Sequence, residues 1–156
     1  MRKRRNRLLF LLDANACNAR QQIAELNELE RIGRSGLIDL EYTETTWDEA
    51  RRNSERRQAK VDRRLFVGLN GDTELEAPWR ESIARVVFPE GVLADDQRRD
   101  VEALLTAKLA GAFFVTRDGA SKTQPGGILG HKVELAALGI EVLTFQEAVQ
   151  RARTAA

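Results

Sequence analysis

The sequence is poor in the residues that build covalent links and soft-metal sites. Its 156 residues contain one cysteine, Cys17, and one histidine, His131. A single cysteine cannot form an intramolecular disulfide, and it excludes a zinc cluster built from cysteines. It fits a reducing compartment, where disulfides are rare. His131 stands at the start of an expected helix, and we assign it no role.

The sequence also lacks a hydrophobic run of membrane-spanning length, which needs about 20 residues. The apolar run 8–12 follows basic residues, as in a signal peptide, but it is too short for that role and ends at Asp13. We therefore expect a cytoplasmic protein without a membrane partner.

The net charge neither indicates nor excludes a nucleic-acid partner, because 25 Lys and Arg balance 24 Asp and Glu. The basic residues are nevertheless clustered. Segment 51–64, which includes Arg52 and Arg56, is a candidate to follow an RNA backbone, and a solvated helix face is the alternative. The N-terminal basic leader, with five basic residues between Arg2 and Arg7, can also follow a phosphate backbone, and disorder of residues 1–6 is the alternative.

The remaining composition is that of a soluble globular protein, with 42% hydrophobic and 31% charged residues. A chain of this length can bury a core of its own. The sequence has no internal repeat, low-complexity segment or domain boundary. We therefore predict one domain over residues 1–156.

Strand and helix patterns alternate along the chain. The expected strands are 7–12, 36–43, 112–116 and 140–143. The expected helices are 15–31, 46–64, 95–109, 128–138 and 145–153. The secondary structure of residues 65–89 is harder to predict, and within them 82–88 fits either a strand or a short helix. The alternation predicts an α/β fold with a mostly parallel central sheet flanked by helices.

Two apolar strands end on a carboxylate, at Asp13 and Asp118. Functional sites of parallel sheets form beyond the carboxyl ends of the strands. Asp100 reaches the same edge, because a helix of roughly 17 Å leads away from it and a strand of roughly 20 Å leads back to Asp118. Asp13 and Asp118, each taken alone, also fit a simple capping role.

Glu49 is the fourth candidate, because it falls early in the helix after the second expected strand. Asp48 competes with it, and a solvated helix acid is the alternative. Four carboxylates at one edge repel one another unless a cation is bound. Hard oxygen ligands suit Mg²⁺ or Mn²⁺, and such an ion can activate water for phosphodiester hydrolysis.

Three further residues have candidate supporting roles. Asn15 can orient Asp13 or a metal-bound water, or it can be a plain helix N-terminal amide. Thr116 can support the metal shell through its hydroxyl, although a β-branched strand residue needs no function. Arg117 can hold a phosphate, and an ordinary exposed arginine is the alternative.

In this order, the motifs resemble those of the PIN-domain family. The segment DANAC, with Asp13 and Asn15, is similar to the family's first motif. YTETTWDEA, with Glu49, resembles the second, in which a hydroxyl-rich strand end precedes a helix. DVEALLTAKLAGAFFVTRD, which begins at Asp100, resembles the third and fourth together. ILGHKVELAALGIEVLTFQEAV resembles the closing helix, strand and helix, so only 65–89 has no counterpart.

The resemblance implies an endoribonuclease that uses Mg²⁺ or Mn²⁺ to cut RNA; we expect a single-stranded or looped substrate. It also implies the toxin of a toxin–antitoxin pair (VapC-like), with an antitoxin partner. We expect a homodimer, with the region 65–89 or the first helices at the interface. The apolar cluster of Leu65, Phe66, Val67 and Leu69 needs burial either against a partner or in the core. The rival is a PIN-fold module that binds nucleic acid or a partner without cleaving. An aspartyl phosphatase is disfavoured, because position 15 is Asn where that class has a second Asp.

Overall fold

The computed structural model describes residues 7–13, 23–43, 66–67, 73–91, 94–119 and 127–155. Within these ranges, five strands form one parallel sheet in the order β3-β2-β1-β4-β5. The strands are β1 (Leu9–Leu12), β2 (Asp39–Thr43), β3 (Phe66–Val67), β4 (Phe113–Val115) and β5 (Val142–Leu143). The helices are α1 (Ala24–Arg34), α4 (Thr73–Val87), α5 (Asp95–Ala110), α6 (Lys132–Ala137) and α7 (Phe145–Ala155).

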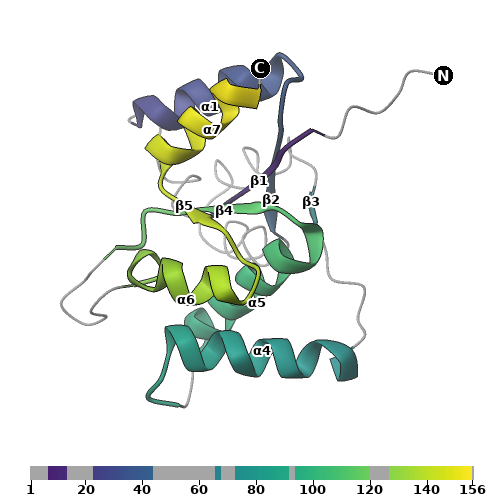
Figure 1. The fold of residues 1–156 in the computed structure, drawn as a ribbon, viewed down its shortest axis with the longest axis vertical. Coiled ribbons are helices and arrows are strands. Elements are labelled where there is room, and N and C mark those ends of the chain that lie inside the picture. The colour runs from purple at the N-terminus through teal and green to yellow at the C-terminus, as the bar shows by residue number, and fades with distance from the viewer. Residues whose placement is uncertain are drawn as a thin grey trace.

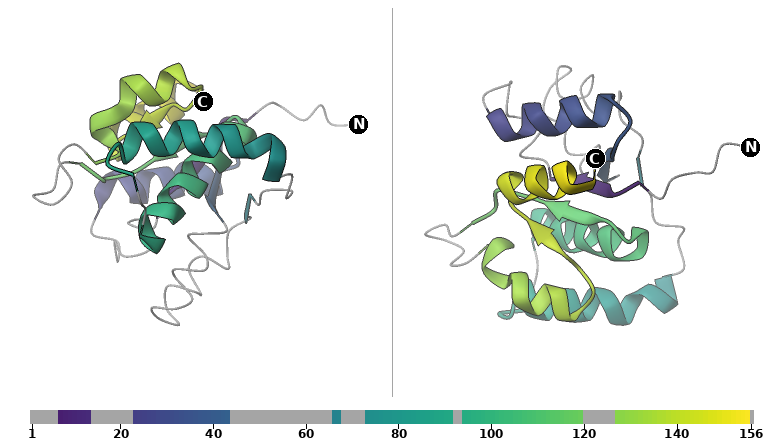
Figure 2. Two further views of the ribbon diagram at one scale, coloured as in Figure 1. Left: turned by 90° about the horizontal axis from the view of Figure 1, so that it is seen from below. Right: turned by 45° about the horizontal axis from the view of Figure 1, so that its top comes forward.

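Helices cover both faces of the sheet, which gives a three-layer arrangement (Figure 1). α1 and α7 lie side by side on one face. α5 and α6 lie on the other face, with α4 packed against them on the outside (Figure 2). The predicted α/β fold, a parallel sheet flanked by helices, is confirmed.

Side chains along each strand alternate between two core layers, because successive residues of a strand point to opposite faces. The layer under α1 and α7 takes Phe10 and Leu12 from β1 and Tyr42 from β2. The layer under α4, α5 and α6 takes Leu11 from β1 and Phe114 from β4. β1 is therefore buried on both faces, as its continuous apolar sequence requires.

Helix α1 packs through one apolar stripe of Leu26, Leu29 and Ile32, all of which are buried. The three-residue spacing of this stripe is the pattern that predicted the helix. The chain then turns at Gly36, whose φ of 78° favours glycine. The earlier part of the expected helix, from residue 15 to residue 22, lies outside the described residues.

Helix α4 settles the alternatives for the stretch 82–88 in favour of a helix. Pro78 lies inside this helix, although proline lacks the N–H that a helix interior needs. The helix forms because Ile83 and Val87 are buried in the layer shared with α5, and such packing outweighs local propensity. Arg80 of α4 adds ion pairs to its helix neighbour Glu76 and, across the helices, to Glu102 of α5.

Helix α5 agrees closely with its predicted range of 95–109. Gly111 ends it in the left-handed conformation, with φ of 63°, and the chain returns directly into β4. Within the part of the chain that the structure describes, no helix is long and apolar enough to cross a membrane. The leader 1–6 and the expected helix 46–64 lie outside the described residues.

Candidate active site at the carboxyl edge of the sheet

Asp13 and Asp118 are joined by a short chain of hydrogen bonds through Thr116. The Thr116 hydroxyl donates to Asp13 Oδ2 at 2.7 Å. The Thr116 hydroxyl oxygen in turn accepts a hydrogen bond from the Asp118 main-chain N–H at 2.9 Å. One fully buried hydroxyl therefore orients the first acid and ties it to the main chain of the second.

The register of β1 and β4 explains why these residues meet. Leu12 is paired with Val115, so the next residues, Asp13 and Thr116, are level with each other. The Asp13 N–H donates to the Val115 carbonyl at 3.0 Å, which extends the pairing beyond the end of β1. The strand order reverses between β1 and β4. In open α/β sheets such a switch point is where ligands bind.

Asp118 is held against the turn that precedes α6. The Ile128 N–H donates to Asp118 Oδ2 at 3.3 Å, and the Leu129 N–H donates to the Asp118 carbonyl at 2.9 Å. A Cβ at Gly127 would lie 2.6 Å from the carbonyl oxygens of Asp118 and Gly119. Glycine at position 127 therefore permits the close approach that positions Asp118.

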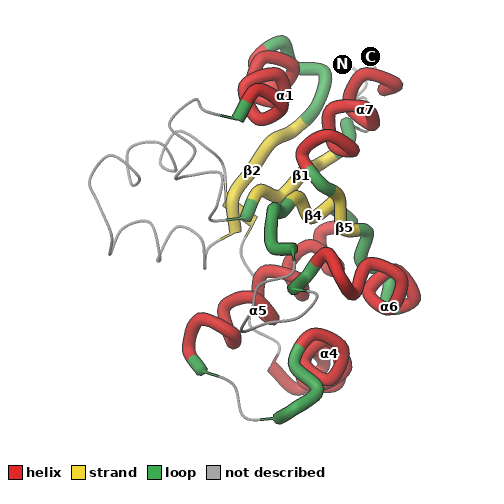
Figure 3. The backbone as a smooth tube through the Cα atoms, turned by 90° about the vertical axis from the view of Figure 1, so that its left-hand side faces the viewer, coloured by secondary structure: helices red, strands yellow, loops and turns green. Residues whose placement is uncertain are grey.

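Asp100 lies six residues into α5 and is half-buried. Figure 3 shows the first turns of α5 on the same side of the molecule as the carboxyl end of β2. The run of α5 directly into β4 agrees with the predicted helix and strand. Within the described ranges, however, no group of three or more Asp, Glu, His or Cys side chains is placed to hold a metal ion. Convergence of the four acids on one ion remains a prediction.

Thr43 at the end of β2 extends the polar row beside Asp13. Leu12 is paired with Tyr42, so Thr43 is level with Asp13 on the neighbouring strand. Thr43 is fully buried. It shares a sheet face with Asp13 and Thr116, because Leu12, Tyr42 and Val115 all belong to the opposite core layer. The acid therefore lies between two threonines, Thr116 and Thr43, and Thr43 belongs to the hydroxyl-rich strand end that resembles the second motif.

Arg117 lies on the opposite face of the sheet from the Asp13–Thr116 hydrogen bond. It lines a hollow with the start of α1 and the start of α7, on the face that those two helices cover. The four other predicted residues lie outside the described part of the chain: Asn15, Glu49, Arg52 and Arg56.

The chemistry of the described acids fits a hard divalent cation. Asp13 and Asp118 offer carboxylate oxygens, which are the ligands that Mg²⁺ and Mn²⁺ prefer. The hydrogen bond from Thr116 to Asp13 is the kind of outer contact that fixes a metal-binding carboxylate.

Comparison with known proteins identifies the fold. No protein-family model matches the sequence, and no curated protein matches it. Among solved structures, the chain is similar to a chain in the crystal structure of VapBC2 from Rickettsia felis bound to a DNA fragment from their promoter. The TM-score is 0.57 at 12% identity, over 88% of this chain and 98% of that chain. The protein therefore has a PIN-like α/β fold; an identity this low shows the fold alone.

Proposed function

We propose that the protein is a divalent-metal-dependent endoribonuclease that hydrolyses phosphodiester bonds in single-stranded or looped RNA. The observation that carries this proposal is the Asp13–Thr116–Asp118 connection at the switch point of a PIN-like sheet. Asp13 and Asp118, with Asp100 and Glu49, would hold Mg²⁺ or Mn²⁺. When bound, such an ion activates water and stabilises the leaving oxygen.

The residues of the chain itself would supply orientation. Thr116 holds one oxygen of Asp13, so the other lone pairs of this carboxylate face a fixed direction. The main-chain bond at Ile128 does the same for Asp118. Fixed acids of this kind lower the cost of organising a metal and a phosphodiester for reaction.

The test is cleavage of a single-stranded oligoribonucleotide with and without added Mg²⁺ or Mn²⁺. We expect cleavage only with metal, and we expect Asp13→Asn to reduce it by about 100-fold or more. The amide oxygen of asparagine can still accept the Thr116 bond. Stability without metal should therefore stay level or rise, because a charge is removed from an acidic edge.

Binding of RNA without metal-dependent cleavage would instead favour the non-cleaving PIN-fold module. If the Asp13→Asn variant cleaves as fast as the parent, Asp13 is not part of the active site. Metal titration by calorimetry separates loss of metal binding from loss of a later step.

A toxin role within a cytoplasmic toxin–antitoxin pair is the finer part of the proposal. Its support is the resemblance of the motifs to VapC-like toxins together with the fold shared with a VapBC2 chain. It includes an antitoxin partner and a homodimer.

Exposed Leu75 and Trp79, one turn apart on α4, supply an apolar surface in the region expected to contribute to that homodimer. A mass near 17.5 kDa by light scattering at micromolar concentration is that of a monomer and would contradict the predicted homodimer.

A further inference from the structure

The hollow beside Arg117 lies next to the candidate active site but on the other face of the sheet. Its volume is about 400 Å³, which is within the range of roughly 300–1,000 Å³ common for ligand sites. The described residues that line it are Ile23, Ala24, Glu25, Arg117, Thr144 and Phe145. Ile23, Ala24 and Phe145 give it an apolar part, and the other three residues give it a polar part.

Among the described residues that line this hollow, Arg117 is the cation. Its side chain is exposed and makes no ion pair or hydrogen bond to the rest of the described chain. Other arginines on this side are already paired: Arg31 donates to Glu28 at 2.7 Å, and Arg153 lies 3.7 Å from the same carboxylate. A guanidinium carries five donors in a planar fork that matches phosphate oxygens. Arg117 is therefore available to an anionic ligand.

Chain connectivity fixes the position of this cation relative to the acids. Arg117 directly follows Thr116, which bonds Asp13, and directly precedes Asp118. Consecutive Cα atoms are about 3.8 Å apart. A polynucleotide whose backbone reaches the acids at this edge therefore brings its neighbouring unit within reach of Arg117.

We propose that this hollow holds the nucleotide next to the scissile bond of single-stranded RNA, with Arg117 binding its phosphate. The inference rests on the proposed nuclease function and adds a defined substrate subsite to it. The apolar part of the hollow accepts the uncharged parts of the nucleotide, while the acids act on the adjacent phosphodiester. Single-stranded RNA fits because its backbone can bend around a sheet edge, which a duplex does not do.

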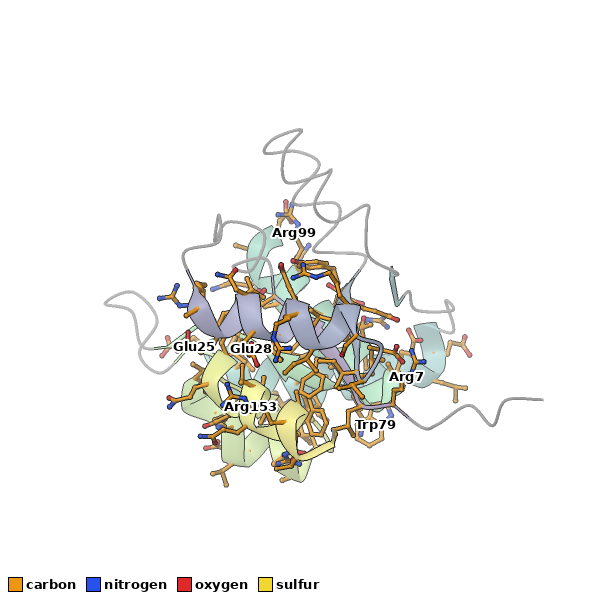
Figure 4. The ribbon with its side chains drawn as sticks, turned by 90° about the horizontal axis from the view of Figure 1, so that it is seen from above. Arg7, Glu25, Glu28, Trp79, Arg99 and Arg153 are labelled. Carbon is orange, nitrogen blue, oxygen red and sulfur yellow. The ribbon has the colours of Figure 1, made fainter. Side chains whose placement is uncertain are left out.

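Glu25 gives the proposal a second, opposite test. Figure 4 shows Glu25 at the N-terminal end of α1, with Glu28 and Arg153 further along between α1 and α7. The Glu25 side chain is exposed and lines the same hollow as Arg117. A phosphate bound there is attracted by Arg117 and repelled by Glu25, so removal of the two charges should change affinity in opposite directions.

Binding is measured separately from cleavage, in the Asp13→Asn background, by fluorescence anisotropy of a labelled single-stranded oligoribonucleotide. We expect Arg117→Gln to weaken binding about 10-fold or more and to reduce the slope of log affinity against log salt by about one. Arg117→Lys should retain part of the affinity, because lysine keeps the charge but loses the fork. Glu25→Gln should strengthen binding several-fold.

Arg153→Gln is the matched control, because Arg153 is an exposed arginine on the same side but belongs to a neighbouring hollow with Glu28. It should leave RNA binding unchanged. Circular dichroism checks that each variant is folded.

The subsite is overturned if Arg117→Gln and Arg153→Gln bind RNA equally well, even where the parent cleaves RNA with metal. It is also overturned if Arg117→Gln keeps RNA affinity but loses affinity for an acidic peptide, because Arg117 then belongs to a protein contact. If the parent neither binds nor cleaves RNA, both the nuclease proposal and the subsite fail.

Discussion

The two faces of the sheet differ most at the carboxyl end of β4. On the face of α4, α5 and α6, Thr116 bonds Asp13, and Asp118 bonds the main chain of Ile128, a residue of that core layer. On the face of α1 and α7, Arg117 lines a hollow. Three consecutive residues thus supply an acidic site on one face and a cation on the other. Single substitutions in this segment should therefore separate chemistry from substrate binding.

The largest expected contrast lies between neighbouring positions 118 and 117. Asp118→Asn should lower kcat by about 100-fold or more, because it removes a proposed metal ligand. Its amide oxygen can still accept the Ile128 N–H, so the fold should remain. Arg117→Gln should raise KM for RNA while kcat stays within a few-fold of the parent. Steady-state kinetics on one oligoribonucleotide measures both, and equal losses of kcat would contradict a division of labour between the faces.

Substitutions of Thr116 test how the Asp13 carboxylate is oriented on the acidic face of the sheet. Thr116→Val should lower metal affinity or activity by about 10- to 100-fold, because it removes the hydroxyl that orients Asp13. It also removes the acceptor of the Asp118 N–H, at a cost of about 1–3 kcal/mol in the free energy of unfolding.

Thr116→Ser keeps the hydroxyl and is the control for this prediction. It should retain most of the activity and metal affinity. If Thr116→Val and Thr116→Ser give the same metal affinity and the same pH dependence of cleavage, the Thr116 hydroxyl does not orient Asp13.

The smallest effects concern two glutamates, one on each face, whose pKa values move in opposite directions. On the side of α7, a hydrogen bond from Lys132 and one from the Thr144 N–H lower the pKa of Glu147 below its ordinary value of 4.5. Ionised Glu147 therefore stabilises the fold at neutral pH, and this contribution is lost as the pH falls below 4.5. Glu147→Gln should destabilise by about 0.5–1 kcal/mol at pH 7, since the pair is partly exposed.

On the opposite face, burial and the nearby charge of Asp39 raise the pKa of Glu41. Ionised Glu41 therefore costs stability at neutral pH, and the cost disappears below 4.5, where the carboxyl is protonated in both the folded and unfolded states. Glu41→Gln should stabilise the protein slightly at pH 7. Thermal unfolding between pH 3 and pH 7 measures both variants. Shifts of the same sign in the two would contradict the assigned environments.

The sequence was informative wherever an apolar pattern was unambiguous. The runs that end at Asp13 and before Asp118 became the adjacent strands β1 and β4, and the pattern of residues 95–109 became α5. It was less informative around Pro78, because proline locally opposes a helix interior while burial of Ile83 and Val87 favours a helix. Sequence spacing cannot show that burial prevails, since the partner of this helix face is α5, a separate segment of the chain.

The sequence by itself determined which residues end strands, which carry carboxylates and which helix returns to which strand, because these follow from local periodicity and length. Only the tertiary structure decided that β1 lies beside β4, so that the Thr116 hydroxyl reaches Asp13 across 103 positions of sequence. Only it placed Gly127 against Asp118 and opened a hollow between Arg117 and the starts of two helices. The physical reason is that strand order and register are set by burying both faces of one sheet at once, a condition that no single segment encodes.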